Sequence, residues 1–158
     1  MSPSKSNLRP ILLAEDNRND VELTLSALHS LNLANDIVIV SDGAEALDWL
    51  YRRGAFAGRT TPGPAIVILD LKMPRVSGLE VLRQIRSDPG LGKLATVILT
   101  SSREESDLVN GYELGANAYV VKPVAFEEFI SAVSRLGVFW ALLNEPPPEP
   151  TGKGPGSP

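Results

Sequence analysis

The stretch from Pro10 to Asp16, Pro-Ile-Leu-Leu-Ala-Glu-Asp, decides the fold class of this 158-residue chain. Its apolar part, residues 10–14, is too short for a helix and ends at two acids, which is typical of a buried strand. Four further short apolar runs have the same character. We therefore expect strands at residues 10–14, 36–40, 65–69, 95–99 and 118–121.

Between these runs, apolar residues recur at the spacing of a helix, as Val21, Leu25 and Leu28 do in the first such segment. The expected helices span residues 19–31, 43–53, 78–87, 104–114 and 124 to about 143, and residues 54–64 are an expected loop rich in Gly, Pro and Thr. Strands that are apolar on both faces and alternate with helices predict an α/β fold. In this fold a doubly wound, five-stranded parallel sheet is covered by helices on both sides.

One domain is predicted over residues 1–144, followed by a tail over residues 145–158. Nine of the thirteen residues from Pro146 to Pro158 are Pro or Gly, and none is a large apolar residue. Such a segment cannot bury enough surface to order itself, so we expect the tail to be disordered.

Composition excludes several classes of function. The chain has no cysteine and a single histidine, which argues against thiolate chemistry, Cys-ligated metals and His-cluster sites. A net charge of −4 gives no indication of nucleic-acid binding. No run approaches the roughly 20 apolar residues of a membrane span, and the first ten residues lack a signal peptide's apolar stretch. We expect a cytoplasmic protein with no nucleic-acid or membrane partner.

Chemically active side chains follow four of the five predicted strands. They are Glu15 and Asp16, Asp70, Thr100 and Lys122. Carboxyl ends of parallel strands share one edge of a sheet, where ligands bind in open α/β folds. Three carboxylates gathered there repel one another and require a cation, and a hard ion such as Mg²⁺ suits an all-oxygen site. With the amine and the hydroxyl, such a site would surround a phosphoryl group.

A plainer interpretation exists for single members of this set. Asp16 or Asn17 would serve as the N-cap of the following helix. The complete set, placed after different strands, favours a site over isolated caps.

The motifs at the strand ends resemble the receiver domain of two-component response regulators. They are Leu13–Asn17, Asp70–Pro74 followed by Gly78, Leu99–Ser101 and Val121–Pro123, and the resemblance runs from Arg9 to about Leu143. It implies the flavodoxin-like (βα)5 fold with strand order 2-1-3-4-5. It also implies a phosphoacceptor switch that catalyses only its own phosphorylation and dephosphorylation, with a sensor histidine kinase as donor.

The resemblance assigns a role to each matched position. Asp70 is the implied phosphoacceptor, and Thr100 and Lys122 the implied contacts of the phosphoryl oxygens. The implied Mg²⁺ ligands are Glu15, Asp16, Asp70 and the backbone carbonyl of Lys72. Thr100 and Tyr119 are the implied switch pair that alters the face made by the fourth helix, fifth strand and fifth helix.

A narrower resemblance links the chain to single-domain regulators paired with bacterial and cyanobacterial phytochromes. It is carried by the loop 52–64, the segment 110–120 and Phe139-Trp140. It implies a bacteriophytochrome as the candidate kinase. Lys72 departs from the commonest receiver pattern, and its side chain would either lie over the phosphoryl group or point to solvent.

The run from Leu136 to Leu143 is uncharged and mostly large and apolar, more than one helix face needs to cover a sheet. Such surplus apolar surface usually marks an interface, so a homodimer is expected through the last helix, with Phe139, Trp140 and Leu143 at the contact. The alternative is a helix end packed under the chain's own loops.

Other functions remain open at this point. One is a slow phosphatase with an aspartyl-phosphate intermediate, although such enzymes usually carry a second Asp where this chain has Lys72. Another is a flavodoxin-like cofactor binder, in which Glu15 and Asp16 would repel the phosphate of FMN. Within the receiver interpretation, the protein acts as a terminal effector or as an intermediate phosphorelay shuttle, for a phytochrome or for another kinase.

Overall fold

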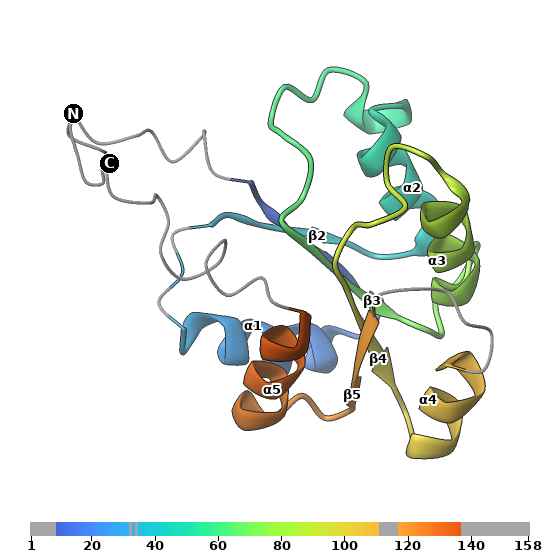
Figure 1. Ribbon diagram of the computed structural model, residues 1–158. Coiled ribbons are helices and arrows are strands. Elements are labelled where there is room, and N and C mark those ends of the chain that lie inside the picture. The colour runs from blue at the N-terminus through green and yellow to red at the C-terminus, as the bar shows by residue number, and fades with distance from the viewer. Residues whose placement is uncertain (1–8, 32, 34, 111–116, 137–158) are drawn as a thin grey trace, which may run out of the picture.

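The computed structural model describes residues 9–31, 33, 35–110 and 117–136, shown in Figure 1. Five strands form one parallel sheet in the order β2-β1-β3-β4-β5, as predicted. They are β1 (Ile11–Ala14), β2 (Ile37–Val40), β3 (Ile66–Asp70), β4 (Thr96–Thr100) and β5 (Asn117–Val121). The helices are α1 (Arg18–His29), α2 (Gly43–Tyr51), α3 (Gly78–Ser87), α4 (Arg103–Asn110) and α5 (Phe126–Leu136), with a short 3-10 helix η2 (Gly54–Phe56).

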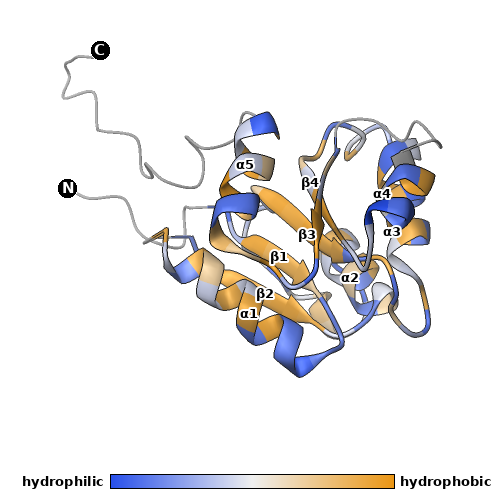
Figure 2. Cartoon of the chain, turned by 90° about the horizontal axis from the view of Figure 1, so that it is seen from below, coloured by the Kyte–Doolittle hydropathy of each residue, from blue (hydrophilic) through white to orange (hydrophobic). Residues whose placement is uncertain are grey.

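The sheet separates two apolar clusters. On one face the strands pack against α1 and α5, through residues such as Leu28 and Phe129. On the other face they pack against α2, α3 and α4, through residues such as Leu47, Leu82 and Val109. Figure 1 shows the same division, and Figure 2 shows the hydrophobic colour concentrated in the strands. This is the predicted doubly wound arrangement.

Burial is not uniform across the sheet. Every residue of β1, β3 and β4 is buried, whereas β2 and β5 include partly exposed residues because each lies at an edge of the sheet. Ile39 of β2 is 45% exposed. The apolar sequence of β2 therefore predicted a strand, but it did not show that this edge strand is partly exposed.

Side-chain caps start the helices that follow the first three strands. The Asn17 side chain accepts from the Asp20 N–H, so Asn17 and not Asp16 is the N-cap of α1. The Asp42 side chain caps α2 through the Glu45 N–H, and Ser77 caps α3 through the Glu80 N–H. These caps satisfy backbone donors that a helix start leaves free.

Several element boundaries differ from the sequence prediction. α1 begins at Arg18 and ends at His29, α2 ends at Tyr51, and α5 begins at Phe126. α2 ends early because Arg52 adopts a left-handed conformation with φ of 53°. The predicted loop over 54–64 contains η2 and is held by Arg59, whose guanidinium lies 3.8 Å from the centre of the Trp49 ring. The predicted ends of the helices at 114 and 143 lie outside the described residues.

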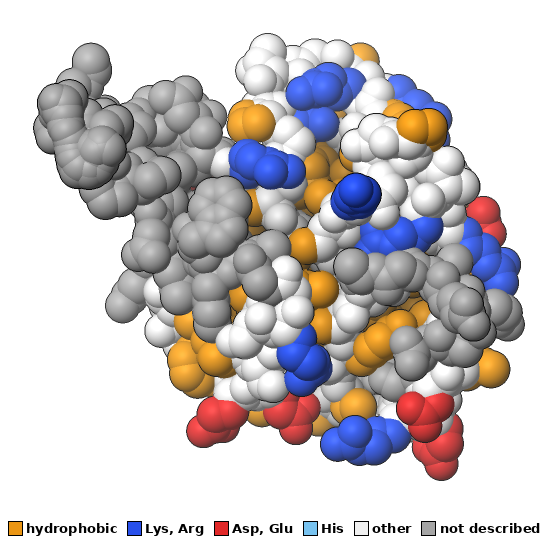
Figure 3. All heavy atoms as spheres, in the orientation of Figure 1, with side chains coloured by type: hydrophobic (Ala, Val, Ile, Leu, Met, Phe, Trp, Pro, Cys, Tyr) orange, Lys and Arg blue, Asp and Glu red, His pale blue; other side chains and the backbone are white. Residues whose placement is uncertain are grey.

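The carboxyl edge of the sheet is acidic. The first turns of α4 and α5 each carry two glutamates, and acidic side chains gather at the lower edge of Figure 3, where these helices lie in Figure 1. Within the described ranges, no helix has the length and apolarity that crossing a membrane requires.

Candidate functional site

The carboxyl edge of the sheet brings the predicted site residues together. Glu15 directly follows β1, Asp70 and Thr100 end β3 and β4, and Lys122 directly follows β5. One oxygen from each of the three carboxylates of Glu15, Asp16 and Asp70 lies within 4.8 Å of the others. Glu15 and Asp16 follow β1 and Asp70 ends β3, and these two strands are parallel neighbours, which explains the approach of the acids.

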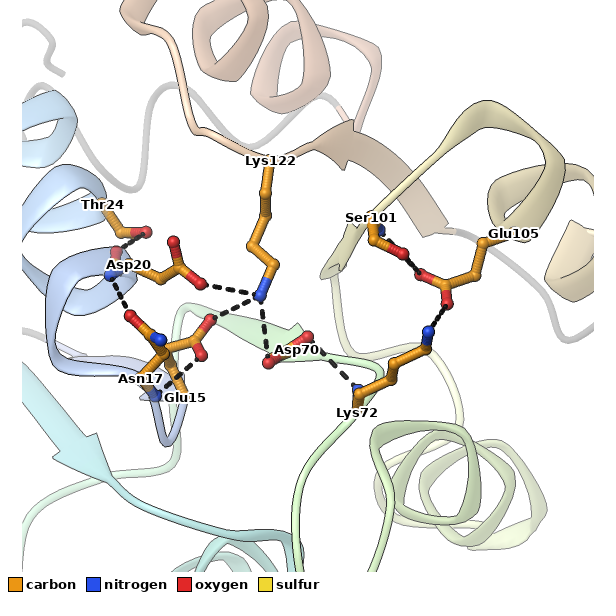
Figure 4. A network of polar contacts seen from close by, with 9 residues as sticks. All are labelled: Glu15, Asn17, Asp20, Thr24, Asp70, Lys72, Ser101, Glu105 and Lys122. Carbon is orange, nitrogen blue, oxygen red and sulfur yellow. Dashed lines mark hydrogen bonds and ion pairs between the residues drawn. The ribbon is translucent and has the colours of Figure 1, made fainter.

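The ammonium group of Lys122 is the centre of an ion-pair network, shown in Figure 4. Its Nζ lies 2.9 Å from Asp20 Oδ2, 3.3 Å from Asp70 Oδ2 and 3.5 Å from Glu15 Oε1. Burial disfavours the charged amine, but the three carboxylates outweigh it and raise the pKa of Lys122. Lys122 therefore supplies a permanent positive charge beside Asp70.

Asp20 is a member of the site that the sequence analysis missed. It lies in the first turn of α1, three residues after the Asn17 cap, where an acid usually reaches back to the cap backbone. Its carboxylate instead makes the shortest of the three contacts with Lys122. The available signal was its spacing of four from Asp16, which places Asp20 in the first turn of the helix that follows this acid.

Glu15 is the most enclosed carboxyl group of the site, with a side chain that is 0% exposed. One oxygen accepts a hydrogen bond from the Asn17 N–H at 3.0 Å, while Oε1 accepts none from the described residues. Burial raises the pKa of Glu15 to about 7, with a further increase from nearby Asp70, against the lowering effects of the Asn17 N–H and of Lys122. Ionised Glu15 thus has one cationic partner among the described residues, Lys122 at 3.5 Å, which it shares with Asp20 and Asp70.

These residues fit a hard divalent cation such as Mg²⁺. The donors are carboxylate oxygens from two adjacent strand ends, and the buried Oε1 of Glu15 has no hydrogen-bond donor in the described part of the chain. Mg²⁺ typically takes one or two carboxylates and keeps several waters, which an edge site with exposed Asp16 permits. The loop after β3 lies close to these groups, since the Lys72 N–H donates to Asp70 Oδ1 at 3.2 Å.

Gly78 allows the chain after Asp70 to fold closely beneath the site. A Cβ atom at this position would lie 2.2 Å from the backbone oxygen of Asp70, far inside van der Waals contact. The Gly78 N–H also donates to the Leu71 carbonyl at 3.0 Å. Glycine at the start of α3 is therefore needed to place the acceptor strand and its following loop together.

The predicted switch residues lie on adjacent strands. Thr100 is fully buried, and its Oγ1 has no hydrogen-bond partner among the described residues. Tyr119 is partly buried and packs against the cluster beneath α4. With Val121, Arg103 of α4 and Arg135 of α5, Tyr119 lines a pocket of about 440 Å³. The Thr100 hydroxyl is thus available as a donor, and space adjoins Tyr119.

Lys72 points toward α4 and not over the acceptor. Its side chain is 74% exposed, and its Nζ lies 3.3 Å from Glu105 Oε2. The other oxygen of Glu105 accepts from the Ser101 N–H at 2.8 Å. Partial burial opposes ionisation of Glu105, but the Ser101 N–H and the Lys72 ammonium lower its pKa. The two side chains form a charged pair on the far side of Asp70 from Lys122 (Figure 4).

The residues predicted at a dimer contact, Phe139, Trp140 and Leu143, lie outside the described residues, as do the tail and residues 111–116 of the narrower resemblance.

Comparison with known proteins identifies related chains. A family model described as the response regulator receiver domain matches residues 11–134. The response regulator Rcp1 of Synechocystis sp. is 31% identical over 140 residues, which cover 89% of this chain and 94% of that relative. The solved structure of the bacteriophytochrome response regulator RtBRR is 57% identical with a TM-score of 0.82, over 89% of this chain and 85% of that chain. A Mn(2+)-bound form of Rcp1 is 30% identical with a TM-score of 0.66, over 84% and 92% of the two chains.

Proposed function

The chain belongs to the response regulator receiver domain family, and on that premise we propose that Asp70 accepts a phosphoryl group from the phosphohistidine of a sensor histidine kinase. The observation that carries the proposal is the position of Asp70 at the end of β3, between the carboxylate cluster and the ammonium of Lys122. As a receiver, the protein changes state on phosphorylation and turns over no other substrate.

The proposed transfer brings together two anions, the Asp70 carboxylate and the phosphoryl group. In the transfer, an oxygen of Asp70 bonds to phosphorus while the bond from phosphorus to the donor's imidazole nitrogen breaks, and that nitrogen keeps the electron pair. Lys122, held charged 3.3 Å from Asp70 Oδ2, reduces the repulsion between the carboxylate and the incoming phosphoryl oxygens. The Thr100 hydroxyl, which lacks a partner among the described residues, then donates to one of those oxygens.

Mg²⁺ is the proposed cofactor, with Glu15, Asp16, Asp70 and the Lys72 carbonyl as its ligands, directly or through water. When bound, the ion neutralises negative charge on the phosphoryl oxygens. The carboxylate geometry supports this assignment, as does the buried Oε1 of Glu15, which accepts no hydrogen bond from the described residues and only pairs with Lys122 at 3.5 Å. The Mn(2+)-bound state of the Rcp1 relative supports it as well.

The proposed output is a shift of the face formed by α4, β5 and α5. A phosphoryl oxygen that engages Thr100 draws its side chain toward the site, and Tyr119 moves into the space this creates. The result is a changed population of two packings of this face. The pocket beside Tyr119 supports the proposal, because a ring of that size needs adjoining space.

A bacteriophytochrome is the proposed kinase partner, and the 57% identity to RtBRR supports it. We further propose a cytoplasmic homodimer with Phe139, Trp140 and Leu143 at its contact. These three residues belong to an apolar run that is larger than one helix face needs to cover a sheet.

Phosphorylation by acetyl phosphate tests the acceptor. With Mg²⁺ present, intact-mass measurement should find one added phosphate on the wild type and none on Asp70→Asn. Asp48→Asn, which removes a carboxylate from α2, should accept phosphate like the wild type. Equal labelling of Asp70→Asn and the wild type would show that another residue is the acceptor.

A further inference from the structure

Lys72 links the acceptor Asp70 to α4, through its backbone N–H on one side and its side-chain ammonium on the other. Its backbone N–H donates to Asp70 Oδ1 at 3.2 Å, and its side chain ends 3.3 Å from Glu105 Oε2. Ser101, whose N–H donates to the other Glu105 oxygen, directly follows the buried Thr100. Figure 4 shows this chain of contacts running away from Asp70 on the opposite side from Lys122.

Glu105 is much better fixed than Lys72. Its carboxylate accepts from the N–H and the hydroxyl of Ser101, at 2.8 and 3.3 Å, and its own N–H donates to Ser102 Oγ at 3.1 Å. The Glu105 side chain is 17% exposed, against 74% for Lys72. Glu105 is therefore a stationary anion, and the flexible stem of Lys72 is the part that can turn.

We propose that Glu105 is a positioning residue that holds the Lys72 ammonium toward α4 and away from the acceptor, and that a phosphoryl group on Asp70 competes with Glu105 for it. The inference rests on the proposed function, since it needs Asp70 to be the acceptor. Lys72 lies two residues from Asp70 and already contacts it through the backbone, so its side chain has a short path to a group attached there.

Charge favours the exchange once phosphorylation has occurred. A phosphoryl group carries more negative charge than the single carboxylate of Glu105 and offers several acceptor oxygens. The pair holds weakly because its Lys72 partner is 74% exposed, and pairs at the surface change equilibria by about two- to fivefold. The pair is thus strong enough to bias Lys72 in the unphosphorylated protein and weak enough to release it.

The exchange would also couple α4 to the phosphorylation state of Asp70. When Lys72 turns away, the first turn of α4 loses its charged contact with the loop after β3, while Glu105 keeps its hydrogen bonds to Ser101. This route reaches α4 by way of Lys72 and does not depend on movement of Tyr119.

Binding of beryllium fluoride in the presence of Mg²⁺, followed by calorimetry, tests the competition. This probe occupies the phosphoryl position on an aspartate and does not hydrolyse. Glu105→Gln removes the charge that holds Lys72 and keeps an oxygen to accept from Ser101. It should bind beryllium fluoride about threefold more tightly than the wild type, as expected for loss of one exposed ion pair.

The decisive comparison makes the Glu105→Gln substitution in a variant that lacks the Lys72 ammonium. In a Lys72→Met background, Glu105→Gln should leave the affinity unchanged, because no ammonium remains to be released. Glu104→Gln removes the same charge from the neighbouring, exposed position of α4 and should match the wild type in both backgrounds. Circular dichroism of each variant checks that the fold is retained.

Two results would overturn the inference: Glu105→Gln that binds beryllium fluoride no more tightly than the wild type, or one that gains equally with Lys72 and with Met at position 72. A wild type that fails to bind beryllium fluoride at all would instead contradict the proposed function.

Discussion

A buried carboxyl group at Glu15 costs stability whenever it is ionised without a metal. Its pKa of about 7 in the folded chain exceeds the ordinary value of 4.5. Between these two pH values the folded state holds a proton that the unfolded state has lost. The free energy of unfolding contributed by this group therefore falls as pH rises from about 4.5 to about 7, and it is constant above that range.

Replacement of Glu15 by Gln should remove this loss. In EDTA above pH 7, Glu15→Gln should be more stable than the wild type, by on the order of 3 kcal/mol at about 1.4 kcal/mol per pKa unit. The difference should shrink as pH falls and vanish near pH 4.5. Urea denaturation across this range measures it.

Glu22→Gln, which neutralises an exposed acid on α1, is the matched control and should follow the wild type at each pH. A constant difference between Glu15→Gln and the wild type across the range would show that Glu15 does not titrate there.

Asp20 and Asp16 should act in opposite directions although both are carboxylates of the same edge. Asp20→Asn removes the closest partner of Lys122 and leaves more of its charge for Asp70 and an incoming phosphoryl group. We expect phosphorylation by acetyl phosphate to become about threefold faster, as for loss of one partly exposed pair. Asp16→Asn, which removes a proposed Mg²⁺ ligand, should slow it strongly. Slower phosphorylation of Asp20→Asn would mean that Asp20 positions Lys122 productively.

At the scale of single elements, the approach of α3 to β3 depends on Gly78. A methyl group there would meet the Asp70 backbone oxygen at 2.2 Å, so either α3 or the acceptor loop has to move. Gly78→Ala should lower the free energy of unfolding by about 2–4 kcal/mol, in the range of other steric faults in a tightly packed region. Urea denaturation provides the measurement.

Gly58→Ala is its matched control, because no atom lies within 4 Å of the added Cβ and the stability should stay within about 0.5 kcal/mol of the wild type. Equal stability of the two alanine variants would show that the α3 connection adjusts without cost.

The order of the elements was predictable because the apolar periods of strands and helices can be read from local sequence. The main site positions were predictable because ligands in open α/β folds bind at the carboxyl ends of the strands. The end of α2 was not, since it rests on the left-handed conformation of Arg52, a residue that carries no glycine signal. Asp20 with Lys122 and Lys72 with Glu105 were also out of reach. Their contacts join side chains 102 and 33 positions apart, and they depend on which way flexible side chains turn.

At the scale of the whole molecule, the apolar run after α5 bears on assembly. Val138, Phe139, Trp140, Leu142 and Leu143 exceed what one helix face needs, and burial of one Phe or Trp in an interface contributes about 2 kcal/mol from its area. A two-fold axis doubles each such contact. We expect a homodimer before phosphorylation, and sedimentation of the wild type beside Phe139→Glu/Trp140→Glu should show the variant as a monomer.

A wild type that sediments as a monomer at tens of micromolar, a concentration set by the order-of-magnitude affinity of such a contact, would remove the assembly proposal.

The ammonium of Lys122 bears on whether the sheet can fold before a divalent ion binds. Because it lies between Glu15, Asp20 and Asp70, the acids at the sheet edge already share a counter-charge that belongs to the chain itself. We therefore expect the sheet, including β5, to form without a divalent ion. If Mg²⁺ binds there as proposed, we expect its removal to prevent phosphorylation of Asp70 while the chain stays folded.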